Sequence, residues 1–182
     1  MPTNKSAIRK QLLKAREILW QEKLELSKKS NKVIASLQLN VPGWPKTTQR
    51  IERVKDTVIT SFYNFLVQKG IESTYTFFSN NVFGTVPFFL FDSPANKIKQ
   101  LAIEFEENYP IGRFIDIDIL NKKQEFVERE KKRQCFFCGR LAIDCMREKR
   151  HSIEDLRRYF DEKLSDFLAA QPFNSMSFHL LE

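Results

Sequence analysis

The chain has 182 residues, 42% of them hydrophobic and 17 of them phenylalanine, which is long enough for one domain with an aromatic core. Only five glycines and seven prolines argue against a collagen-like or low-complexity chain. No apolar run reaches the length of a membrane span, no signal peptide opens the chain, and three cysteines are an odd number for a disulfide framework. We therefore expect a cytoplasmic protein with no membrane partner.

The net charge of +7 is unevenly distributed along the chain. Residues 1–32 contain nine basic and three acidic residues, and residues 121–150 contain ten and five. Basic patches attract polyanions such as nucleic acid, phosphorylated ligands or acidic proteins. For much of residues 1–32, an ordinary solvated helix face is the simpler explanation.

The first half of the chain predicts a helix, a strand and a second helix. Apolar residues at near-helical spacing predict one basic amphipathic helix within residues 1–30. Alternation over residues 33–41 predicts a half-buried strand, which ends where proline and glycine mark a loop at residues 40–46. Apolar spacing over residues 51–69 predicts the second helix, closed by Gly70.

The second half predicts two strands, each followed by a helix. The continuous apolar run of residues 86–91 predicts a buried strand, and Ser93-Pro94 then provides an N-cap and a proline for the next helix. Residues 112–120 predict a further strand, rich in β-branched residues. A helix over 152–170, capped by Ser152, precedes the tail.

Strands that alternate with helices predict an α+β or α/β fold, with a single mixed sheet flanked by helices. We expect residues 1–182 to form one domain. Its predicted parts are the N-terminal helix 1–30, a sheet and helix core 31–120, a basic Cys/His segment 121–151, a helix 152–170 and a tail 171–182. No glycine-rich phosphate loop of the P-loop or Rossmann type occurs, which argues against those nucleotide folds.

Two aspartates one residue apart, Asp116 and Asp118, stand in the strand predicted over residues 112–120. Side chains alternate along a strand, so both carboxylates lie on one face and repel each other unless something neutralises them. Mg²⁺ or Mn²⁺ prefers such oxygen ligands, and metal-assisted phosphoryl or nucleotidyl transfer is the commonest chemistry that needs the pair. The alternative is a polar edge-strand face with two solvated aspartates, because D-x-D is a short motif.

Cys135, Cys138, Cys145 and His151 form a second cluster of reactive residues in the basic segment. Four such ligands fit a tetrahedral structural zinc site, and Cys-x₂-Cys is the usual first half of one. The spacing of the second half is less usual. The alternative is that the cysteines pack among neighbouring phenylalanines with His151 elsewhere, and the residues alone do not decide between the two.

Three blocks of residues follow one another in a fixed order: Leu39-Asn40-Val41-Pro42-Gly43 with Lys46; Gly112 to Asp118; and Arg133 to Cys138 with Ala142, Cys145, Arg147, Arg150 and His151. In this order and spacing they resemble the apo-citrate lyase phosphoribosyl-dephospho-CoA transferases, which are the holo-acyl-carrier-protein synthases of citrate lyase. The segment Ala15-Arg16-Glu17 also resembles the N-terminus of that family.

The resemblance implies a reaction and its partners. Members of this family transfer the phosphoribosyl-dephospho-CoA group from triphosphoribosyl-dephospho-CoA to a serine of the citrate lyase γ subunit, an acyl carrier protein, and diphosphate leaves. Asp116 and Asp118 would hold Mg²⁺ on the triphosphate and help to deprotonate the serine. Nucleic acid and membranes take no part.

Lys46 is a further catalytic candidate beside the two aspartates, and other residues of the three blocks are candidates for substrate binding. Lys46 would reach a phosphate as a point charge, with a hydrogen bond from Asn40. The basic segment would stabilise diphosphate as it leaves or dock an acidic carrier protein. Strand alternation places Arg113 on the face opposite the aspartates, where it would serve structure instead. The candidates are Asn40, Gly43, Arg113, Arg133, Arg147 and Arg150, and each arginine could equally be a surface cation.

Three other interpretations are considered. The chemistry suggests a distant likeness to the nucleotidyltransferase fold, yet the Gly-Ser pair that usually precedes D-x-D in that superfamily is missing between Glu104 and Gly112. The cysteine cluster and basic charge also suit a zinc-containing nucleic-acid-binding protein or a non-catalytic protein that only binds the carrier. The acid pair argues against nucleic acid, because without a metal it would repel phosphate.

Overall fold

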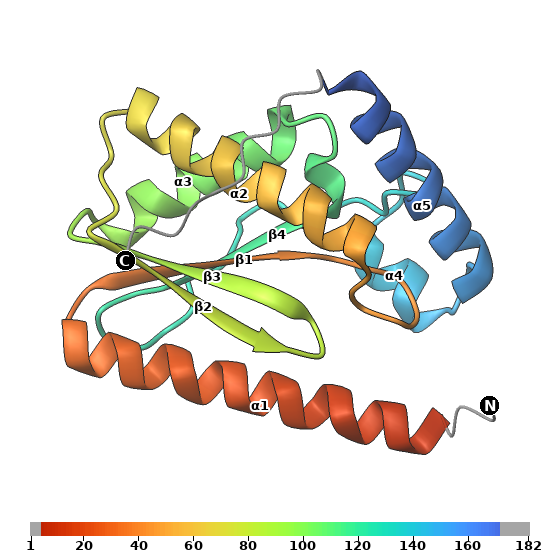
Figure 1. The fold of residues 1–182 in the computed structure, drawn as a ribbon, viewed down its shortest axis with the longest axis horizontal. Coiled ribbons are helices and arrows are strands. Elements are labelled where there is room, and N and C mark those ends of the chain that lie inside the picture. Colours follow the sequence, from red (N-terminus) through yellow and green to blue (C-terminus); the bar gives the residue numbers. More distant parts are fainter. Residues whose placement is uncertain (1–4, 172–182) are drawn as a thin grey trace.

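The computed structural model describes residues 5–171, and within this range it describes residues 75–80 by their backbone alone. Figure 1 shows the arrangement of the elements. In chain order they are α1 (Lys5–Ser30), β1 (Val33–Leu39), α2 (Gln49–Gln68), β2 (Tyr75–Asn81), β3 (Gly84–Phe91), α3 (Ala95–Asn108), a 3₁₀ turn (Gly112–Phe114), β4 (Ile115–Leu120), α4 (Ala142–Arg147) and α5 (Ile153–Ala170). The predicted tail lies outside the described residues from residue 172 onward.

The four strands form one sheet in the order β2-β3-β1-β4, and every neighbouring pair is antiparallel. The predicted α+β class and the single sheet are therefore confirmed, but the sheet is antiparallel rather than mixed. β1 lies in the middle of the sheet, and its pairing with β4 sets Gln38 opposite Asp116 and Ser36 opposite Asp118.

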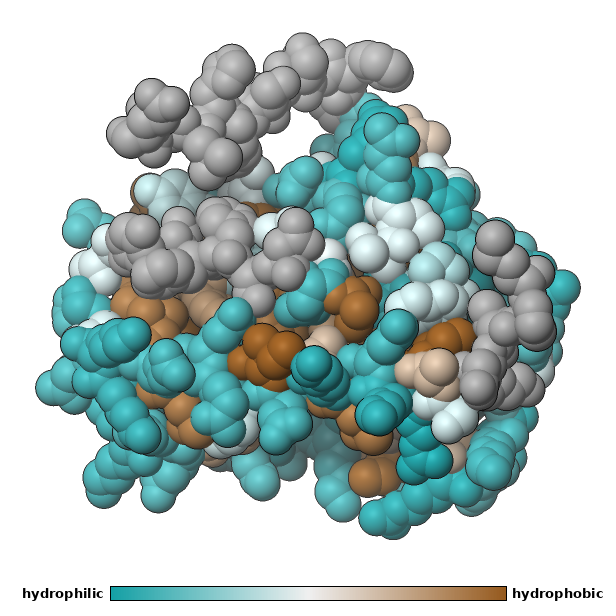
Figure 2. Space-filling view, turned by 60° about the horizontal axis from the view of Figure 1, so that its bottom comes forward, coloured by the Kyte–Doolittle hydropathy of each residue, from teal (hydrophilic) through white to brown (hydrophobic). Residues whose placement is uncertain are grey.

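Helices cover both faces of the sheet. α1 lies alone along one face, while α2, α3 and α5 lie on the other (Figure 1). The larger core fills the three-helix side, where Ile115, Ile117 and Ile119 of β4 meet residues of those helices. A smaller apolar cluster, which includes Leu19 and Leu120, lies on the α1 side. Viewed toward α1, the surface is mostly hydrophilic, with apolar residues gathered near its middle (Figure 2).

The strand predicted first is buried on both of its faces. Val33, Ala35 and Leu37 enter the larger core, as the alternation predicts. Ile34 and Ser36 on the opposite face are also buried, since α1 covers them. The prediction of a half-buried strand is therefore wrong. The sequence of β1 alone does not indicate that α1 packs on its second face.

Two predicted boundaries also shift. Residues 112–114 form a 3₁₀ turn, and the strand begins only at Ile115. Gly112 is required in that turn, because a Cβ atom there would lie 2.0 Å from the backbone oxygen of Glu106. Pro94 rather than Ser93 occupies the N-cap position of α3, without a side-chain capping bond. The Ser152 cap is confirmed, since its hydroxyl accepts a hydrogen bond from the backbone N–H of Asp155.

None of the helices in the described part of the chain is both long and apolar enough to cross a bilayer.

Candidate functional site

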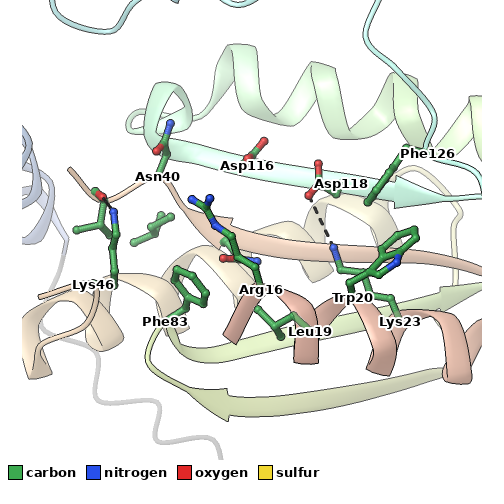
Figure 3. Close-up of a pocket in the computed structure, with 13 residues that line it drawn as sticks. Arg16, Leu19, Trp20, Lys23, Asn40, Lys46, Phe83, Asp116, Asp118 and Phe126 are labelled. Carbon is green, nitrogen blue, oxygen red and sulfur yellow. Dashed lines mark hydrogen bonds and ion pairs between the residues drawn. The ribbon is translucent and has the colours of Figure 1, made fainter. Parts of the chain in front are cut away.

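A pocket of about 460 Å³ lies between α1 and the strands β1 and β4 (Figure 3). Its volume is within the range of about 300–1,000 Å³ that is usual for small-molecule sites. It is lined by Arg16, Leu19, Trp20, Lys23, Gln38, Leu39, Asn40, Val41, Lys46, Phe83, Asp116, Asp118 and Phe126. Four candidates taken from the sequence, Asn40, Lys46, Asp116 and Asp118, therefore meet in one pocket.

The two aspartates share one face of β4, as the alternation predicts, because the isoleucines beside them turn to the core on the other face. Asp118 lies 3.7 Å from Nζ of Lys23, and Asp116 lies 3.1 Å from Nη2 of Arg133. Nearly half of each aspartate side chain is exposed, at 46% and 48%. Each carboxylate thus has a side-chain cation beside it and still keeps an open side toward the pocket.

Partial burial alters the protonation equilibria at this wall. Burial raises the pKa of Asp116, and the charge of Asp118 raises it further, while Arg133, Lys99 and Lys23 oppose the rise. Burial likewise lowers the pKa of Lys23, against the attraction of the two aspartates. Charges that are incompletely solvated interact more strongly than charges in bulk water, so this wall can act on a charged ligand.

Arg133 is held in place by a buried carboxylate, Glu106, of which 4% is exposed. Glu106 forms ion pairs with Arg129 and Arg133, and its Oε1 accepts a hydrogen bond of 2.7 Å from the backbone N–H of Ile117. Arg133 in turn donates to the carbonyl of Ile115 at 2.8 Å. These side chains satisfy the free edge of β4, which would otherwise expose unpaired backbone groups, and they fix Arg133 beside Asp116.

Lys46 enters the pocket from the loop that follows β1. Its ammonium donates to the carbonyl of Val41 at 2.6 Å. Burial lowers its pKa, and the nearby charges of Arg16 and Arg157 lower it further. Arg157 on α5 donates to the carbonyl of Pro45 at 2.9 Å and so holds the loop. Lys46 therefore belongs to a locally cationic end of the pocket.

A second buried network ties this loop to the hairpin between β2 and β3. Lys55 on α2 donates to Glu52 at 2.8 Å and to the carbonyl of Phe83 at 2.7 Å. Glu52 also accepts from the hydroxyl of Thr47 at 2.6 Å and from the backbone N–H of Thr85 at 3.0 Å. Burial lowers the pKa of Lys55, against the attraction of Glu52. The network fixes the neighbours of two pocket residues, Lys46 and Phe83.

Residues of α1 and of the segment after β4 also line the pocket, and they were not predicted from the sequence. Arg16, Trp20 and Lys23 follow one another at helical spacing on the side of α1 that faces the pocket (Figure 3). Phe126 stacks on Trp20 with ring centroids 5.0 Å apart, and Lys23 Nζ lies 5.5 Å from the Phe126 ring centroid. A signal was present, because Lys23 continues the stripe of Ala15 and Leu19 that is buried against the sheet.

The other five predicted substrate-binding residues do not line this pocket. Arg113 is exposed in the 3₁₀ turn, so the strand alternation applied to it does not hold. Gly43 has a left-handed backbone, and a Cβ atom on it would come within 2.8 Å of the Ile153 side chain, so it serves the packing of the loop. Arg147 and Arg150 are exposed beside the cysteine cluster, where Arg150 pairs with Glu148. Arg133 contacts Asp116, which lines the pocket, without lining it itself.

The four predicted ligands of the Cys/His cluster lie close together in the structure. One ligand atom from each of Cys135, Cys138, Cys145 and His151 lies within 4.8 Å of all the others. Sγ of Cys138 is 3.4 Å from Sγ of Cys145 and 3.3 Å from Nε2 of His151. In a tetrahedral zinc site, ligand atoms are about 3.8 Å apart, because each is about 2.3 Å or less from the metal. The cluster could therefore bind a metal, and the alternative with His151 elsewhere is wrong.

Two thiols of this cluster, Cys138 and Cys145, have opposite pKa shifts. A backbone hydrogen bond from Arg140 is the main reason that the pKa of Cys138 falls to about 6, with further bonds from Cys145 and His151. Burial raises the pKa of Cys145 to about 11, and the neighbouring sulfur atoms add to the rise. Phe136, between Cys135 and Cys138, packs against Phe114 at 5.0 Å and joins this module to the larger core.

Comparison with known proteins identifies one family. The model of the family described as "Apo-citrate lyase phosphoribosyl-dephospho-CoA transferase" matches residues 8–167. A relative of Vibrio cholerae serotype O1 (strain M66-2), named a probable apo-citrate lyase phosphoribosyl-dephospho-CoA transferase, is 25% identical over 86% of this chain and 91% of its own length. A Streptococcus pyogenes serotype M3 relative of the same name is 29% identical over 86% and 84%. "Protein CitXG" of Leuconostoc mesenteroides subsp. cremoris is 28% identical over 86% of this chain and 35% of its own.

Proposed function

Because this chain belongs to the apo-citrate lyase phosphoribosyl-dephospho-CoA transferase family, we propose that it modifies a serine of the citrate lyase γ subunit, an acyl carrier protein. The donor is triphosphoribosyl-dephospho-CoA, and diphosphate is the second product. The observation that carries this proposal is the pocket itself, because two carboxylates and the cations Arg16 and Lys46 line one small-molecule-sized space.

The proposed reaction is a displacement at phosphorus. The serine oxygen forms a bond to the α-phosphorus of the triphosphate, and the bond from that phosphorus to the bridging oxygen breaks. The electron pair leaves with diphosphate, and the hydroxyl proton passes to a carboxylate of the pocket or to water. The carrier keeps a phosphodiester, so every atom of the phosphoribosyl-dephospho-CoA group stays on the serine.

Asp116 and Asp118 have a donor set that fits Mg²⁺. Hard carboxylate oxygens suit this ion, which usually binds one or two carboxylates together with phosphates and water. The 3.7 Å contact between Lys23 and Asp118 is longer than a hydrogen bond, which leaves lone pairs of that carboxylate available. When bound, Mg²⁺ would neutralise charge on the triphosphate and make its α-phosphorus easier to attack.

The remaining roles follow from position in the pocket. Lys46 and Arg16 bind the oxygens of the β- and γ-phosphates and stabilise the charge that develops on diphosphate. Asn40 lines the pocket at the same end as Lys46 and supplies a hydrogen bond to the substrate (Figure 3). Arg133 orients Asp116 rather than touching the substrate. Arg113, Arg147 and Arg150 lie outside the pocket and take no part in the proposed chemistry.

We also propose that the Cys/His cluster holds a structural zinc ion through Cys135, Cys138, Cys145 and His151. Three thiolates and an imidazole complete a tetrahedral shell without an open position, which is the pattern of structural rather than catalytic zinc. Such an ion would stabilise the segment from which Arg133 reaches Asp116.

The experiment that tests the function measures both products. The purified chain is incubated with apo γ subunit, Mg²⁺ and triphosphoribosyl-dephospho-CoA, and diphosphate release is compared with modified carrier. We expect equal amounts of the two, no reaction in EDTA, and no reaction with a carrier whose target serine is replaced by alanine. Diphosphate without modified carrier would identify a hydrolase instead, and neither product, with carrier and precursor shown competent by another synthase, would favour a binding protein.

A further inference from the structure

The pocket has two chemically different ends. Lys46 and Asn40 stand at one end, while Trp20 and Phe126 stand at the other, and the aspartates lie along the wall between them (Figure 3). A ligand that carries only phosphates would use the cationic end and leave the aromatic end empty. The arrangement matches an elongated ligand with phosphates at one end and a planar apolar group at the other.

The backbone after β4 places Phe126 on the side of the sheet that faces the pocket. After β4, the side chain of Asn121 accepts hydrogen bonds from the backbone N–H groups of Lys123 and Glu125, which closes a tight turn. Phe126 then pairs with Leu120 across that turn. Paired residues of antiparallel strands project from the same face, and Leu120 shares its face with Asp118. Phe126 therefore stands on the same surface as the acid pair.

The Phe126 ring is accessible, although the backbone of this residue is fixed by its bridge to Leu120. One of its faces contacts Trp20, but 49% of the residue is exposed. Lys23 lies near the same ring and adds a positive charge. Exposed aromatic rings beside cations are the usual platforms for nucleobases, since every base has a π-face that can stack.

We infer that Trp20 and Phe126 form a stacking platform for the adenine ring of the substrate, with its triphosphate directed to Arg16 and Lys46. This inference rests on the proposed function, because dephospho-CoA is an adenine nucleotide. It adds a base-binding subsite to the phosphate-binding end. Along α1, Arg16 and Lys23 are separated by about 10 Å at 1.5 Å per residue, which leaves room for sugar between the two ends.

The test uses the fluorescence of Trp20 in the full-length chain. The chain contains two tryptophans, and Trp44 does not line the pocket, so Trp44→Phe leaves Trp20 as the single reporter. Two probes are titrated in Mg²⁺: dephospho-CoA, which carries adenine, and inorganic tripolyphosphate, which does not. We expect saturable quenching by dephospho-CoA, and binding of tripolyphosphate that calorimetry detects but that leaves the fluorescence unchanged.

Phe126→Leu then separates stacking from simple packing, because leucine keeps an apolar side chain at this turn. Dephospho-CoA should bind between about 5-fold and 150-fold more weakly, the factors that correspond to about 1–3 kcal/mol for one base stack. Tripolyphosphate should bind as before. Tyr63→Leu is the matched control, since Tyr63 on α2 is 44% exposed and does not line the pocket. It should change neither affinity.

The outcomes separate this inference from the proposed function. If Phe126→Leu weakens both probes equally, or neither, and Trp20 is not quenched while the wild type still modifies the carrier, the platform is wrong and the transferase stands. If dephospho-CoA quenches Trp20 and Phe126→Leu weakens the binding of that probe only, but no carrier is modified, the stacking platform is correct and the proposed function is wrong. The chain would then be an adenine-nucleotide-binding protein with another activity.

Discussion

The ammonium group of Lys23 lies 3.7 Å from the carboxylate of Asp118, and only 7% of the lysine side chain is exposed. A buried cation from α1 thus occupies the neighbourhood in which the acid pair would receive a divalent metal. The lysine and the metal carry charge of the same sign, so each must weaken the attraction of the other to Asp118.

We therefore predict that Lys23→Met tightens the binding of Mn²⁺, used as a probe for Mg²⁺. Removing one positive charge about 4 Å away is worth at least about 1 kcal/mol, which corresponds to about fivefold in affinity. Titration of the two proteins followed by Mn²⁺ paramagnetic resonance measures the difference. Lys29→Met is the control, because Lys29 on the same helix is 78% exposed and forms a surface ion pair with Glu25. Unchanged or weaker Mn²⁺ binding in Lys23→Met would contradict the competition.

The buried carboxylate of Glu106 gives a prediction on stability. Glu106→Ala should lower the free energy of unfolding by about 3–5 kcal/mol, because it leaves Arg129 and Arg133 without their shared buried partner. Glu107→Ala is a close control: Glu107 contacts the same Arg129 at 3.2 Å but is 56% exposed, so its loss should cost less than about 1 kcal/mol. Chemical denaturation measures both, and similar losses would mean that the Glu106 network is not what holds this edge of β4.

Lys55 gives a prediction that depends on pH. Burial lowers the pKa of Lys55 in the folded chain below its unfolded value, so between the two values the unfolded chain binds more protons. Stability from this group therefore rises as pH rises toward the unfolded pKa. Lys55→Met should cost about 1–3 kcal/mol near pH 7, because the carbonyl of Phe83 loses its donor.

The difference in unfolding free energy between wild type and Lys55→Met should then widen from pH 7 toward pH 10. Urea denaturation at several pH values follows this difference directly. Lys69→Met serves as a comparison, since the side chain of Lys69 is 40% exposed and its pairing with Glu104 is a surface contact. A difference that stays constant or narrows with pH would show that burial does not depress the pKa of Lys55.

Cys138→Ser tests the cysteine cluster. If the cluster holds zinc, the purified wild type should contain about one zinc ion per chain, and the variant should contain little and melt at least about 5 °C lower. Met146→Ser, in the same segment and 71% exposed, should keep both the metal and the melting temperature. If elemental analysis finds no zinc in wild type that was expressed with added zinc, the assignment of a structural zinc ion to this cluster is wrong.

Elements with a strong hydrophobic pattern were predictable from the sequence. Elements that form through pairing or packing with other segments were not. The apolar stripes of α2 and α5 and the apolar run of β3 are local signals, and each became the predicted element. β2 ends in Ser79-Asn80-Asn81, a poor strand sequence, and it exists through its full pairing with β3. α4 is six residues long, which is too short to show a helical period.

The same distinction applies to the candidate site: residues in local motifs were predictable from the sequence, and residues brought in by packing were not. Asp116, Asp118, Asn40 and Lys46 could be named because each stands in a short local motif. Lys23 comes from a segment that is distant in sequence, and only the packing of α1 across the sheet brings it to the acid pair, whereas the turn after β4 brings Phe126 there. A charged residue on the apolar stripe of α1 was the one available sign. Arg147 and Arg150 belong to the same sequence block as Arg133, yet they are exposed beside the cysteine cluster and do not line the pocket.

We propose that the acid pair of β4 serves group transfer, and intact mass spectrometry of the apo γ subunit can test this role. The carrier is incubated with Mg²⁺, triphosphoribosyl-dephospho-CoA and either wild type, Asp116→Asn, Asp118→Asn or the surface control Asp92→Asn, whose side chain is 69% exposed. We predict a mass gain equal to the phosphoribosyl-dephospho-CoA group with wild type and Asp92→Asn, and initial rates at least about a hundredfold lower with the other two folded variants. Near-normal rates in Asp116→Asn or Asp118→Asn would contradict the claim.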